Sequence, residues 1–337
     1  MKLATRIEEA GVLLADGATG TNFFQVGLQA GDAPELWNVD EPERVKALHR
    51  AFAQAGADIV LTNTFGGNAR RLMLHDAQDR VVELNAAAAR LARDVADEFD
   101  REILVAGSVG PTGDLFEPLG PMTETDAQAV FAEQIAGLRE GGADLIWIET
   151  MSSQEEIRAA AAAARKSGLE YVFTASFDTA GRTMMGLPPS QLPVMAAAMD
   201  PPPTAVGANC GVGATDLLFS LLDMTEPATT GLPALAFVAK ANCGVPRVSG
   251  DEVVYTGTPE TMAAYVAKAV DAGASIIGGC CGTTPEHLAA MRAALDTHER
   301  GARPTLQDIV AATGELVNPI AGEKSPASSS RRRGRRR

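Results

Sequence analysis

Short apolar segments recur along this 337-residue chain, and stretches with helical periodicity separate them. The apolar segments are nearly continuous rather than alternating, which is typical of parallel strands buried on both faces. They predict strands over 12–17, 58–65, 103–109, 144–150, 171–177, 205–210, 236–242 and 275–280. Alanine-rich amphipathic patterns predict helices over 42–55, 77–98, 125–140, 154–167, 213–223, 258–272 and 285–297. This alternation predicts an α/β protein built on a parallel sheet.

Start and stop signals agree with these helices. Thr258-Pro259 and Thr284-Pro285 each read as an N-cap followed by proline at the first helical position. Glycines mark several helix ends, namely Gly56, Gly142 and Gly273. Eight strand–helix units in roughly 290 residues have the count and size of a TIM (β/α)8 barrel. A doubly wound open sheet is the alternative, but it rarely needs eight strands at such regular spacing.

We therefore expect a single barrel domain over residues 1–300, a short C-terminal extension over 301–323 and a disordered, arginine-rich tail over 324–337. The net charge of the chain is −14, and the tail contributes +7. The rest of the chain therefore carries −21. So acidic a body repels nucleic acid. A low-complexity tail of this kind serves either as a solubility segment or as an electrostatic tether to an acidic partner or to the chain's own body.

Targeting signals are missing from the sequence. The longest apolar runs are under about ten residues, whereas a transmembrane helix needs about 20. The start of the chain lacks the apolar stretch of a signal peptide, and four cysteines in 337 residues do not make a disulfide framework. We therefore expect a cytoplasmic protein with reduced thiols and no membrane partner; a homo-oligomer stays possible.

All four cysteines lie at or just after the end of a predicted strand. They belong to the sixth, seventh and eighth units and are Cys210, Cys243, Cys280 and Cys281. Barrel active sites lie at the C-terminal ends of the strands, so residues remote in sequence would meet at one rim. We therefore favour a shared metal or thiol site over ordinary packing of buried cysteines.

Cys280 and Cys281 are adjacent and can face one metal only if the chain leaves the strand there, which the glycines on either side permit. A phosphate loop or a redox dithiol is the alternative, but a phosphate loop gains nothing from two thiols. Three thiolates suit Zn²⁺ and leave a fourth tetrahedral position open. Cys243 is the competing fourth ligand of a closed site. The histidines fall in predicted helices, as surface or packing residues: His49, His75, His287 and His298.

Loops at the predicted strand ends carry a set of motifs. These are DGATGT over 16–21, TNTFG over 62–66, SVGP over 108–111, IET over 148–150, GANC over 207–210 and GGCCGT over 278–283. Together they resemble the homocysteine S-methyltransferase family, over about residues 8–310. That family includes betaine–homocysteine methyltransferase, S-methylmethionine-dependent enzymes and the homocysteine module of cobalamin-dependent methionine synthase. The Asn-Cys and Gly-Gly-Cys-Cys-Gly motifs are highly specific to it.

The resemblance implies one Zn²⁺ per chain, held by Cys210, Cys280 and Cys281. The family usually has a small residue without a thiol where Cys243 stands, which argues against Cys243 as a ligand. The substrate would be homocysteine, whose thiol has a pKa of roughly 8.5 by analogy with cysteine. Metal binding deprotonates a thiol, so the zinc-activated substrate thiolate would itself be the nucleophile, with no catalytic side chain, and methionine the product.

The amino-acid end of the substrate needs its own contacts. Asp16 and Glu149 resemble the residues with which the family binds the amino group. Gly17 would leave the backbone open for close approach of the substrate. Asn209 and Asn63 are expected to orient the substrate or its ligands. A hydrolase or lyase is the weaker reading because no histidine stands at a strand end, and a non-catalytic zinc or homocysteine-binding module is another alternative.

The methyl donor is open from the sequence. Betaine is normally held by aromatic faces, and Trp37 and Phe65 are candidate contacts. Gly66 and Thr150 stand where betaine enzymes resemble one another in having tyrosine, which weakens this reading. A methyl-corrinoid such as methylcobalamin, carried by a partner protein as in a split methionine synthase, is an equal candidate. S-methylmethionine or another sulfonium is the third.

Overall fold

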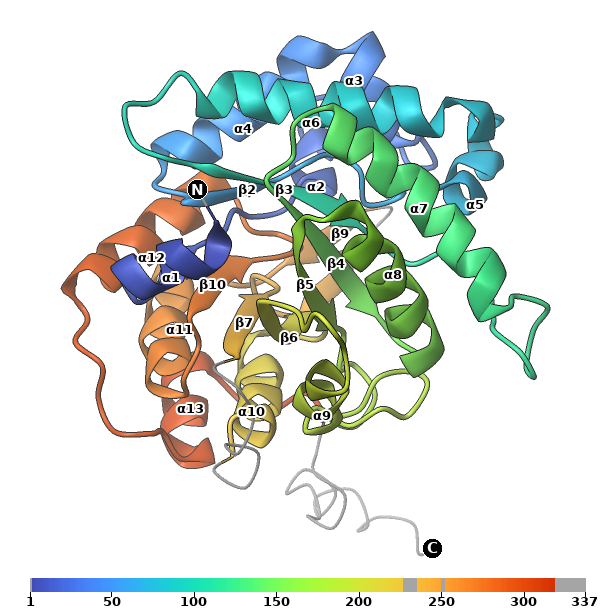
Figure 1. The fold of residues 1–337 in the computed structure, drawn as a ribbon. Helices are drawn as coiled ribbons and strands as arrows, with labels where there is room; N and C mark the ends of the chain where they lie inside the picture. The colour runs from blue at the N-terminus through green and yellow to red at the C-terminus, as the bar shows by residue number, and fades with distance from the viewer. Residues whose placement is uncertain (1, 227–234, 250–251, 319–337) are drawn as a thin grey trace, which may run out of the picture.

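The computed structural model describes residues 2–226, 235–249 and 252–318. Eight parallel strands form one sheet in the order β1-β10-β7-β6-β5-β4-β3-β2. They are β1 (Leu13–Leu14), β2 (Ile59–Leu61), β3 (Leu104–Val109), β4 (Leu145–Met151), β5 (Glu170–Ala175), β6 (Ala205–Cys210), β7 (Ala236–Ala241) and β10 (Ile276–Gly279). A parallel bridge between Ala15 and Ile59 joins the two edge strands. The sheet is therefore a nearly closed, TIM-like barrel, as predicted (Figure 1).

Helices surround the barrel and connect successive strands (Figure 1). Those that match the sequence prediction are α4 (Pro42–Gln54), α6 (Val81–Ala96), α7 (Glu124–Glu140), α8 (Gln154–Ser167), α10 (Ala214–Met224), α11 (Pro259–Asp271) and α12 (Pro285–Thr297). The helix expected over 77–98 is shorter, because a 3-10 turn over Gln78–Arg80 precedes α6. Among the described residues, no helix combines the length and the apolar character that crossing a membrane requires.

Several elements were not predicted. They are α1 (Leu3–Ala10), α2 (Gly20–Phe24), α3 (Trp37–Asp40), α5 (Ala69–Leu72), α9 (Gln191–Ala197), 3-10 turns at Pro34–Leu36 and Met73–His75, and an antiparallel hairpin of β8 (Pro246–Ser249) and β9 (Glu252–Tyr255). Within the expected C-terminal extension lies α13 (Leu306–Thr313). The predicted basic tail over 324–337 falls outside the described residues.

Both faces of the sheet are buried, and alternate residues of each strand serve different cores. One set fills the barrel interior and includes Leu104, Leu145, Trp147, Val172 and Val238. The intervening residues pack outward against the helices, for example Val105, Ile146, Phe173 and Ala239. This explains why the strands are apolar without alternation. Because side chains alternate along a strand, the inward-facing residues at the C-terminal ends of the strands point into the site.

The seam between β1 and β2 is reinforced at the opposite, N-terminal end of the strands. Asp58, just before β2, accepts a hydrogen bond from Leu14 N at 2.9 Å and lies 3.2 Å from Arg292. Its own N–H donates to Leu14 O at 2.6 Å. Because β1 has only two residues, this carboxylate adds a side-chain bond to the few backbone bonds that complete the ring.

Side-chain caps begin several helices where the sequence places Ser or Thr. Thr123 accepts from Asp126 N at 3.0 Å at the start of α7, and Thr258 accepts from Thr261 N at 3.3 Å at the start of α11. Thr284 forms a capping box with His287 at the start of α12. The three glycines expected after helices have the positive φ of that position: 103° at Gly56, 94° at Gly142 and 104° at Gly273.

Candidate metal and substrate site

Three of the four thiols meet at the C-terminal rim of the barrel. The Sγ atoms of Cys210, Cys280 and Cys281 all lie within 4.8 Å of one another, and the Cys210–Cys281 pair is 4.0 Å apart. Cys210 ends β6, and the other two follow β10, so segments 70 residues apart supply the cluster. The juxtaposition expected from the strand ends is therefore present.

Unusual backbone conformations turn these thiols toward each other. Cys210 has a φ of 63°, in the left-handed region that non-glycine residues rarely adopt. Gly211 and Gly282, which follow the two cysteine segments, have φ values of 73° and 79°. The chain thus leaves β10 at Gly279, and adjacent cysteines can face one point. Strain in a non-glycine residue at such a place is characteristic of functional sites.

The geometry and the chemistry of the cluster fit a zinc ion. A tetrahedral Zn²⁺ with Zn–S distances of about 2.3 Å requires sulfurs about 3.8 Å apart. The 4.0 Å between Cys210 and Cys281 is close to that value. Three soft thiolates are a zinc-type donor set, and they leave one position open.

Hydrogen bonding distributes the protons unequally among the three thiols. The hydrogen bonds that the Cys210 thiol donates to Cys280 and Cys281, together with burial, raise the pKa of Cys210. The hydrogen bonds that the Cys281 sulfur accepts from Cys210 and Cys280 lower the pKa of Cys281. These hydrogen bonds therefore favour the thiolate form at Cys281 and the protonated form at Cys210.

A cavity of about 430 Å³ opens onto the thiols. All three cysteines line it, together with Glu149, Lys240 and a largely apolar wall. The rest of the wall comes from the turn after β1 and α2, from the end of β2 and the loop after it, from the ends of β3 and β4 and from the 3-10 turn before α3: Gly17, Ala18, Thr19, Gly20, Thr21, Phe24, Pro34, Glu35, Leu61, Thr62, Asn63, Thr64, Phe65, Ser108 and Thr150. The cavity is large enough for a small amino acid beside the sulfur cluster.

Glu149 points into the barrel from the end of β4. Ser108, from the end of β3, donates its hydroxyl proton to Glu149 Oε1 at 2.5 Å. Burial raises the pKa of Glu149 to about 7, although the nearby Lys240 ammonium opposes the shift. The carboxylate therefore changes charge near neutral pH, and a cation that binds beside it would favour its ionised form.

Asp16 lies just after β1, at the strand end where the sequence placed it. It is buried and does not line the cavity. Its Oδ2 accepts from Leu61 N at 2.8 Å, and its Oδ1 lies 3.2 Å from Lys240 Nζ. Burial raises the pKa of Asp16, and the ammonium of Lys240 opposes that rise. The Asp16 carboxylate was expected to bind the ammonium group of the substrate. In this structure the ammonium group of Lys240 lies beside that carboxylate.

Asn209 does not line the cavity but lies beside the sulfur cluster, in contact with Cys280. Its Oδ1 accepts from Thr150 N at 2.8 Å and from Thr174 Oγ1 at 2.6 Å. Its Nδ2 donates to Thr150 Oγ1 at 2.7 Å and lies 3.9 Å from Cys280 Sγ. Thr150, with a φ of 61°, is the second strained non-glycine residue at this rim. Asn209 therefore couples the end of β4 to a thiol.

Asn63 and Gly17 line the cavity, but both are engaged within the protein. Asn63 Nδ2 donates to Pro34 O at 2.7 Å and to Asn38 Oδ1 at 3.0 Å. A Cβ on Gly17 would lie 2.7 Å from both Phe52 Cε1 and Thr283 O. Packing against these two groups therefore requires a glycine here, and the close approach of a substrate to Gly17 stays a prediction.

The two aromatic candidates separate. Phe65 lines the cavity, and 41% of its surface is exposed. Phe24 also lines the cavity and is 52% exposed. Trp37 does not line it: its ring packs on Phe23 at 5.0 Å and under Arg44 at 5.1 Å. Two phenylalanines at the mouth therefore supply the aromatic faces that the cavity presents.

Cys243 is excluded from the thiol cluster. It is buried, and burial raises the pKa of its thiol to about 11. Its N–H donates to Cys281 O at 2.9 Å, and a Cβ on Gly257 would lie 2.8 Å from its sulfur. Cys243 packs beneath the loop that carries two of the thiols.

Two charged side chains of the cavity were missed in the sequence. Lys240 interrupts the apolar run over 236–242, and a lysine at an inward position of a buried strand is itself a signal. Glu35 is 4% exposed and accepts from Gly66 N at 2.6 Å. Glu35 does not follow a predicted strand, so the sequence offers no reason to place it at the site. The fold of the 3-10 turn that carries it brings its side chain to the cavity wall.

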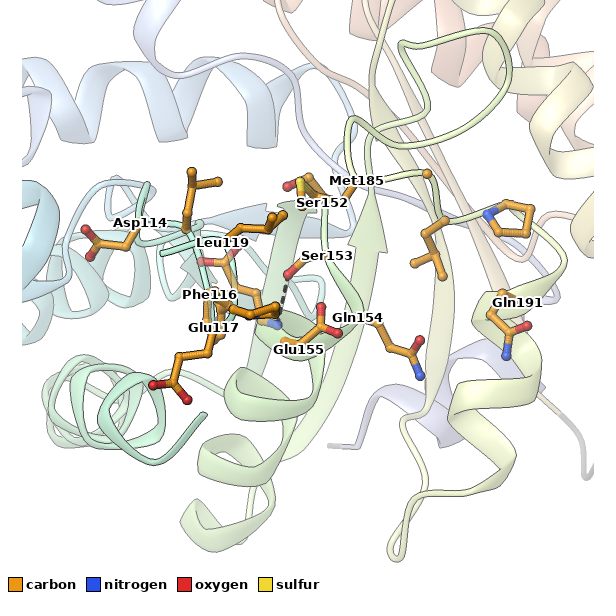
Figure 2. Close-up of a pocket in the computed structure, with 16 residues that line it drawn as sticks. Asp114, Phe116, Glu117, Leu119, Ser152, Ser153, Gln154, Glu155, Met185 and Gln191 are labelled. Atoms are coloured by element: carbon orange, nitrogen blue, oxygen red, sulfur yellow. Dashed lines mark hydrogen bonds between the residues drawn. The ribbon is translucent and has the colours of Figure 1, made fainter. Parts of the chain in front are cut away.

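A larger hollow of about 500 Å³ lies farther around the rim, between the loops after β3, β4 and β5. Figure 2 shows Phe116, Glu117 and Leu119 on one side of it and Gln191 on the other, with the start of α8 between them. The residues that line it include four acids and several apolar side chains but neither a cysteine nor a basic residue. The smaller cavity, which holds the thiols, is the candidate for chemistry.

Comparison with known proteins identifies the family to which the chain belongs. A model of the homocysteine S-methyltransferase family matches residues 13–295. The methionine synthase of Mycobacterium leprae (strain TN) is 29% identical over 95% of this chain and 28% of its own length. That of Mycobacterium tuberculosis (strain ATCC 25618 / H37Rv) is 30% identical over 87% of this chain and 25% of its own length. The chain thus spans about a quarter of these curated relatives.

Solved structures of the homocysteine methyltransferase MmuM from Escherichia coli share the fold. The oxidized form has a TM-score of 0.69 at 26% identity and covers 84% of this chain and 95% of that one. The metallated form has a TM-score of 0.68 at 26% identity, with 84% and 96% covered. With the family model matching most of the chain, the protein belongs to the homocysteine S-methyltransferase family of enzymes.

Proposed function

We propose that this protein transfers a methyl group to the thiol of L-homocysteine on a zinc ion held by Cys210, Cys280 and Cys281, and so makes methionine. The observation that carries the proposal is the convergence of three thiols within 4.8 Å at the edge of a cavity of about 430 Å³. When bound there, zinc would deprotonate the substrate thiol and keep its sulfur nucleophilic.

The protein's own residues bind and orient the amino acid. Glu149 is the carboxylate placed to receive the substrate ammonium, because it lines the cavity whereas Asp16 is paired with Lys240. The role of Asp16 is therefore to position Lys240 rather than to contact substrate. Asn209 fixes Cys280, and Asn63 holds the wall through its bonds to Pro34 and Asn38. Holding the methyl donor in line with the sulfur supplies much of the acceleration.

The donor is either betaine or a methyl-corrinoid carried by a partner protein. Phe24 and Phe65 offer aromatic faces to a quaternary ammonium, and Trp37 packs elsewhere. Aromatic contacts to such a cation contribute about 0.5–2 kcal/mol each. A mouth with two exposed phenylalanines also suits an apolar partner surface. A sulfonium such as S-methylmethionine is the third candidate.

Parallel assays of methionine formation from homocysteine with betaine, S-methylmethionine and methylcobalamin test the proposal. We expect turnover with one donor class in zinc-loaded protein and none after chelation. If stoichiometric zinc and homocysteine bind but no donor supports transfer, the protein is a binding module instead. If no zinc binds under reducing conditions, the metal assignment is wrong.

Single cysteine variants test the ligand set. Cys210→Ala, Cys280→Ala and Cys281→Ala should each lose stoichiometric zinc and methyl transfer, because two thiolates are too few for a site of this kind. Cys243→Ala is the matched control and should keep both. Zinc content by atomic absorption checks the expectation. Loss of zinc in Cys243→Ala would overturn the three-cysteine assignment.

A further inference from the structure

Lys240 is a buried cation on the wall of the thiol cavity. It is 2% exposed, its Nζ donates to Gly279 O at 2.8 Å, and the same atom lies 3.2 Å from Asp16 Oδ1. Burial alone would lower the pKa of Lys240, but Asp16 and Glu149 outweigh it and raise the pKa. A lysine is almost never buried so fully unless its charge is paired, so this position calls for an explanation.

The path of the side chain is built into the barrel. Lys240 on β7 stands opposite Gly278 on β10, and its side chain crosses that strand to reach Asp16 after β1. A Cβ on Gly278 would lie 2.9 Å from Lys240 Cγ and 3.1 Å from Ala15 Cβ. The absence of a side chain at Gly278 therefore leaves the space through which the lysine passes.

Lys240 is also bonded to the segment that carries Cys280. The peptide unit between Gly279 and Cys280 has two polar groups, and β7 binds both. Lys240 Nζ donates to its carbonyl at 2.8 Å, and its N–H donates to Ala241 O at 2.7 Å. Movement of the lysine would therefore release one side of the peptide that places a thiol.

The charges around the cavity require a cation there. Three thiolates on a divalent ion carry −1, and a bound substrate thiolate makes −2. Glu149 lines the same cavity and Asp16 lies behind it, whereas Lys240 supplies the positive side chain among the lining residues. Like charges repel strongly where water is excluded.

We propose that Lys240 is a positioning residue of the zinc–thiolate centre, which fixes the Cys280 peptide and offsets the negative charge of the sulfurs. Asp16 in turn holds the lysine at that place. The inference rests on the proposed function, since it requires a metal at the three thiols. Partners that orient metal ligands typically contribute about 10–100-fold in metal affinity.

Zinc dissociation constants, measured by competition with a chromophoric chelator, test this in the full chain. The variants are Lys240→Met, Asp16→Asn and the double variant Asp16→Asn/Lys240→Met, with Lys46→Met as a surface control. Lys46 pairs with Asp94 at the exterior, far from the thiols in sequence and outside the cavity lining. The double variant removes both charges together, so it should fold even if Lys240→Met, which strands a buried carboxylate, does not.

We expect the double variant to bind zinc about 10–100-fold more weakly than the parent, with an altered visible spectrum of its cobalt-substituted form. Asp16→Asn alone should lose less, because Lys240 keeps its bond to Gly279, and Lys46→Met should bind like the parent. If the double variant binds zinc as tightly as the parent, Lys240 only neutralises Asp16 and the inference is wrong. If the parent itself binds no zinc, the proposed function fails instead, so the two failures are distinguishable.

Discussion

At the scale of single residues, the site contains side chains held in states that an ordinary fold avoids. Glu149 and Lys240 are buried charges, and Thr150 and Cys210 have a left-handed backbone. Each feature costs stability by itself, and all four lie at the same rim. Such concentration of unfavourable states marks the part of the molecule where function rather than packing has determined the residue.

Glu149 gives a prediction for the dependence of stability on pH. Its pKa in the folded protein is about 7, above the ordinary 4.5, so the folded state holds the proton more tightly than the unfolded state. Stability from this group is therefore present below about pH 4.5 and is lost as the pH rises to about 7. Glu149→Gln should be more stable than the parent at pH 8 by up to about 3 kcal/mol and equal to it near pH 4.5.

Urea unfolding of the chelator-treated protein at the two pH values measures this difference, with Glu83→Gln as the surface control because Glu83 is exposed and paired with Arg80. Homocysteine binding should weaken in Glu149→Gln at and above neutral pH, where the parent carboxylate is charged. Equal stability of variant and parent at pH 8 would mean that Glu149 ionises at its ordinary pKa.

At the scale of elements, the strongest sequence signals gave the best boundaries. The helix predicted over 154–167 has the observed bounds of α8, because a serine N-cap, alanine-rich periodicity and a left-handed Gly168 all agree. All eight barrel strands were also predicted, because each is a short and nearly continuous apolar segment. The strand expected over 12–17 is only two residues long, since Asp16 pairs with Lys240 and Gly17 belongs to the cavity wall.

What the sequence could not give depends on how distant elements meet. The thiol cluster was predictable because cysteines at strand ends share one rim. The bond between Lys240 and Asp16 was not, because it requires the register of β7 on β10 and the closure of β1 beside them. The role expected of Asp16 came from the family resemblance, and that resemblance does not reveal a lysine on β7, which β10 separates from β1.

Helix α7 offers a test of a single element. Thr123 caps its first turn through a 3.0 Å bond from Asp126 N. Thr123→Ala should lower the free energy of unfolding by about 1 kcal/mol, because one N–H loses its partner. Thr297→Ala, at the exposed end of α12, should change it by less than about 0.5 kcal/mol. Chemical denaturation checks both, and a similar loss in both variants would contradict a specific capping effect.

At the scale of the whole molecule, the two ends of the barrel have separate roles. The rim at the C-terminal ends of the strands carries the thiols, the buried charges and the strained residues. The opposite end carries the seam, where Asp58 binds Leu14 N and lies beside Arg292. Changes at one end should therefore alter function, and changes at the other should alter stability.

Asp58→Asn tests this separation. Loss of its charge weakens the bond to Leu14 N and the pairing with Arg292, so the free energy of unfolding should fall by about 1–3 kcal/mol. Zinc affinity should stay within about twofold of the parent. Asp94→Asn, which removes an exposed pair with Lys46, should cost less than about 1 kcal/mol. Weaker zinc binding in Asp58→Asn would show that the two ends are coupled.

The three clustered sulfurs belong to the end of β6 and to the turn after β10. The part of the cavity wall without thiols, here called the organic wall, comes mainly from the turns after β1 and β2 and from the ends of β3 and β4. The ring is thus divided into an inorganic sector and an organic one. Directed evolution restricted to the organic sector could exchange one methyl source for another without disturbing a single sulfur. That modularity would allow relatives with very different co-substrates to diverge from one scaffold.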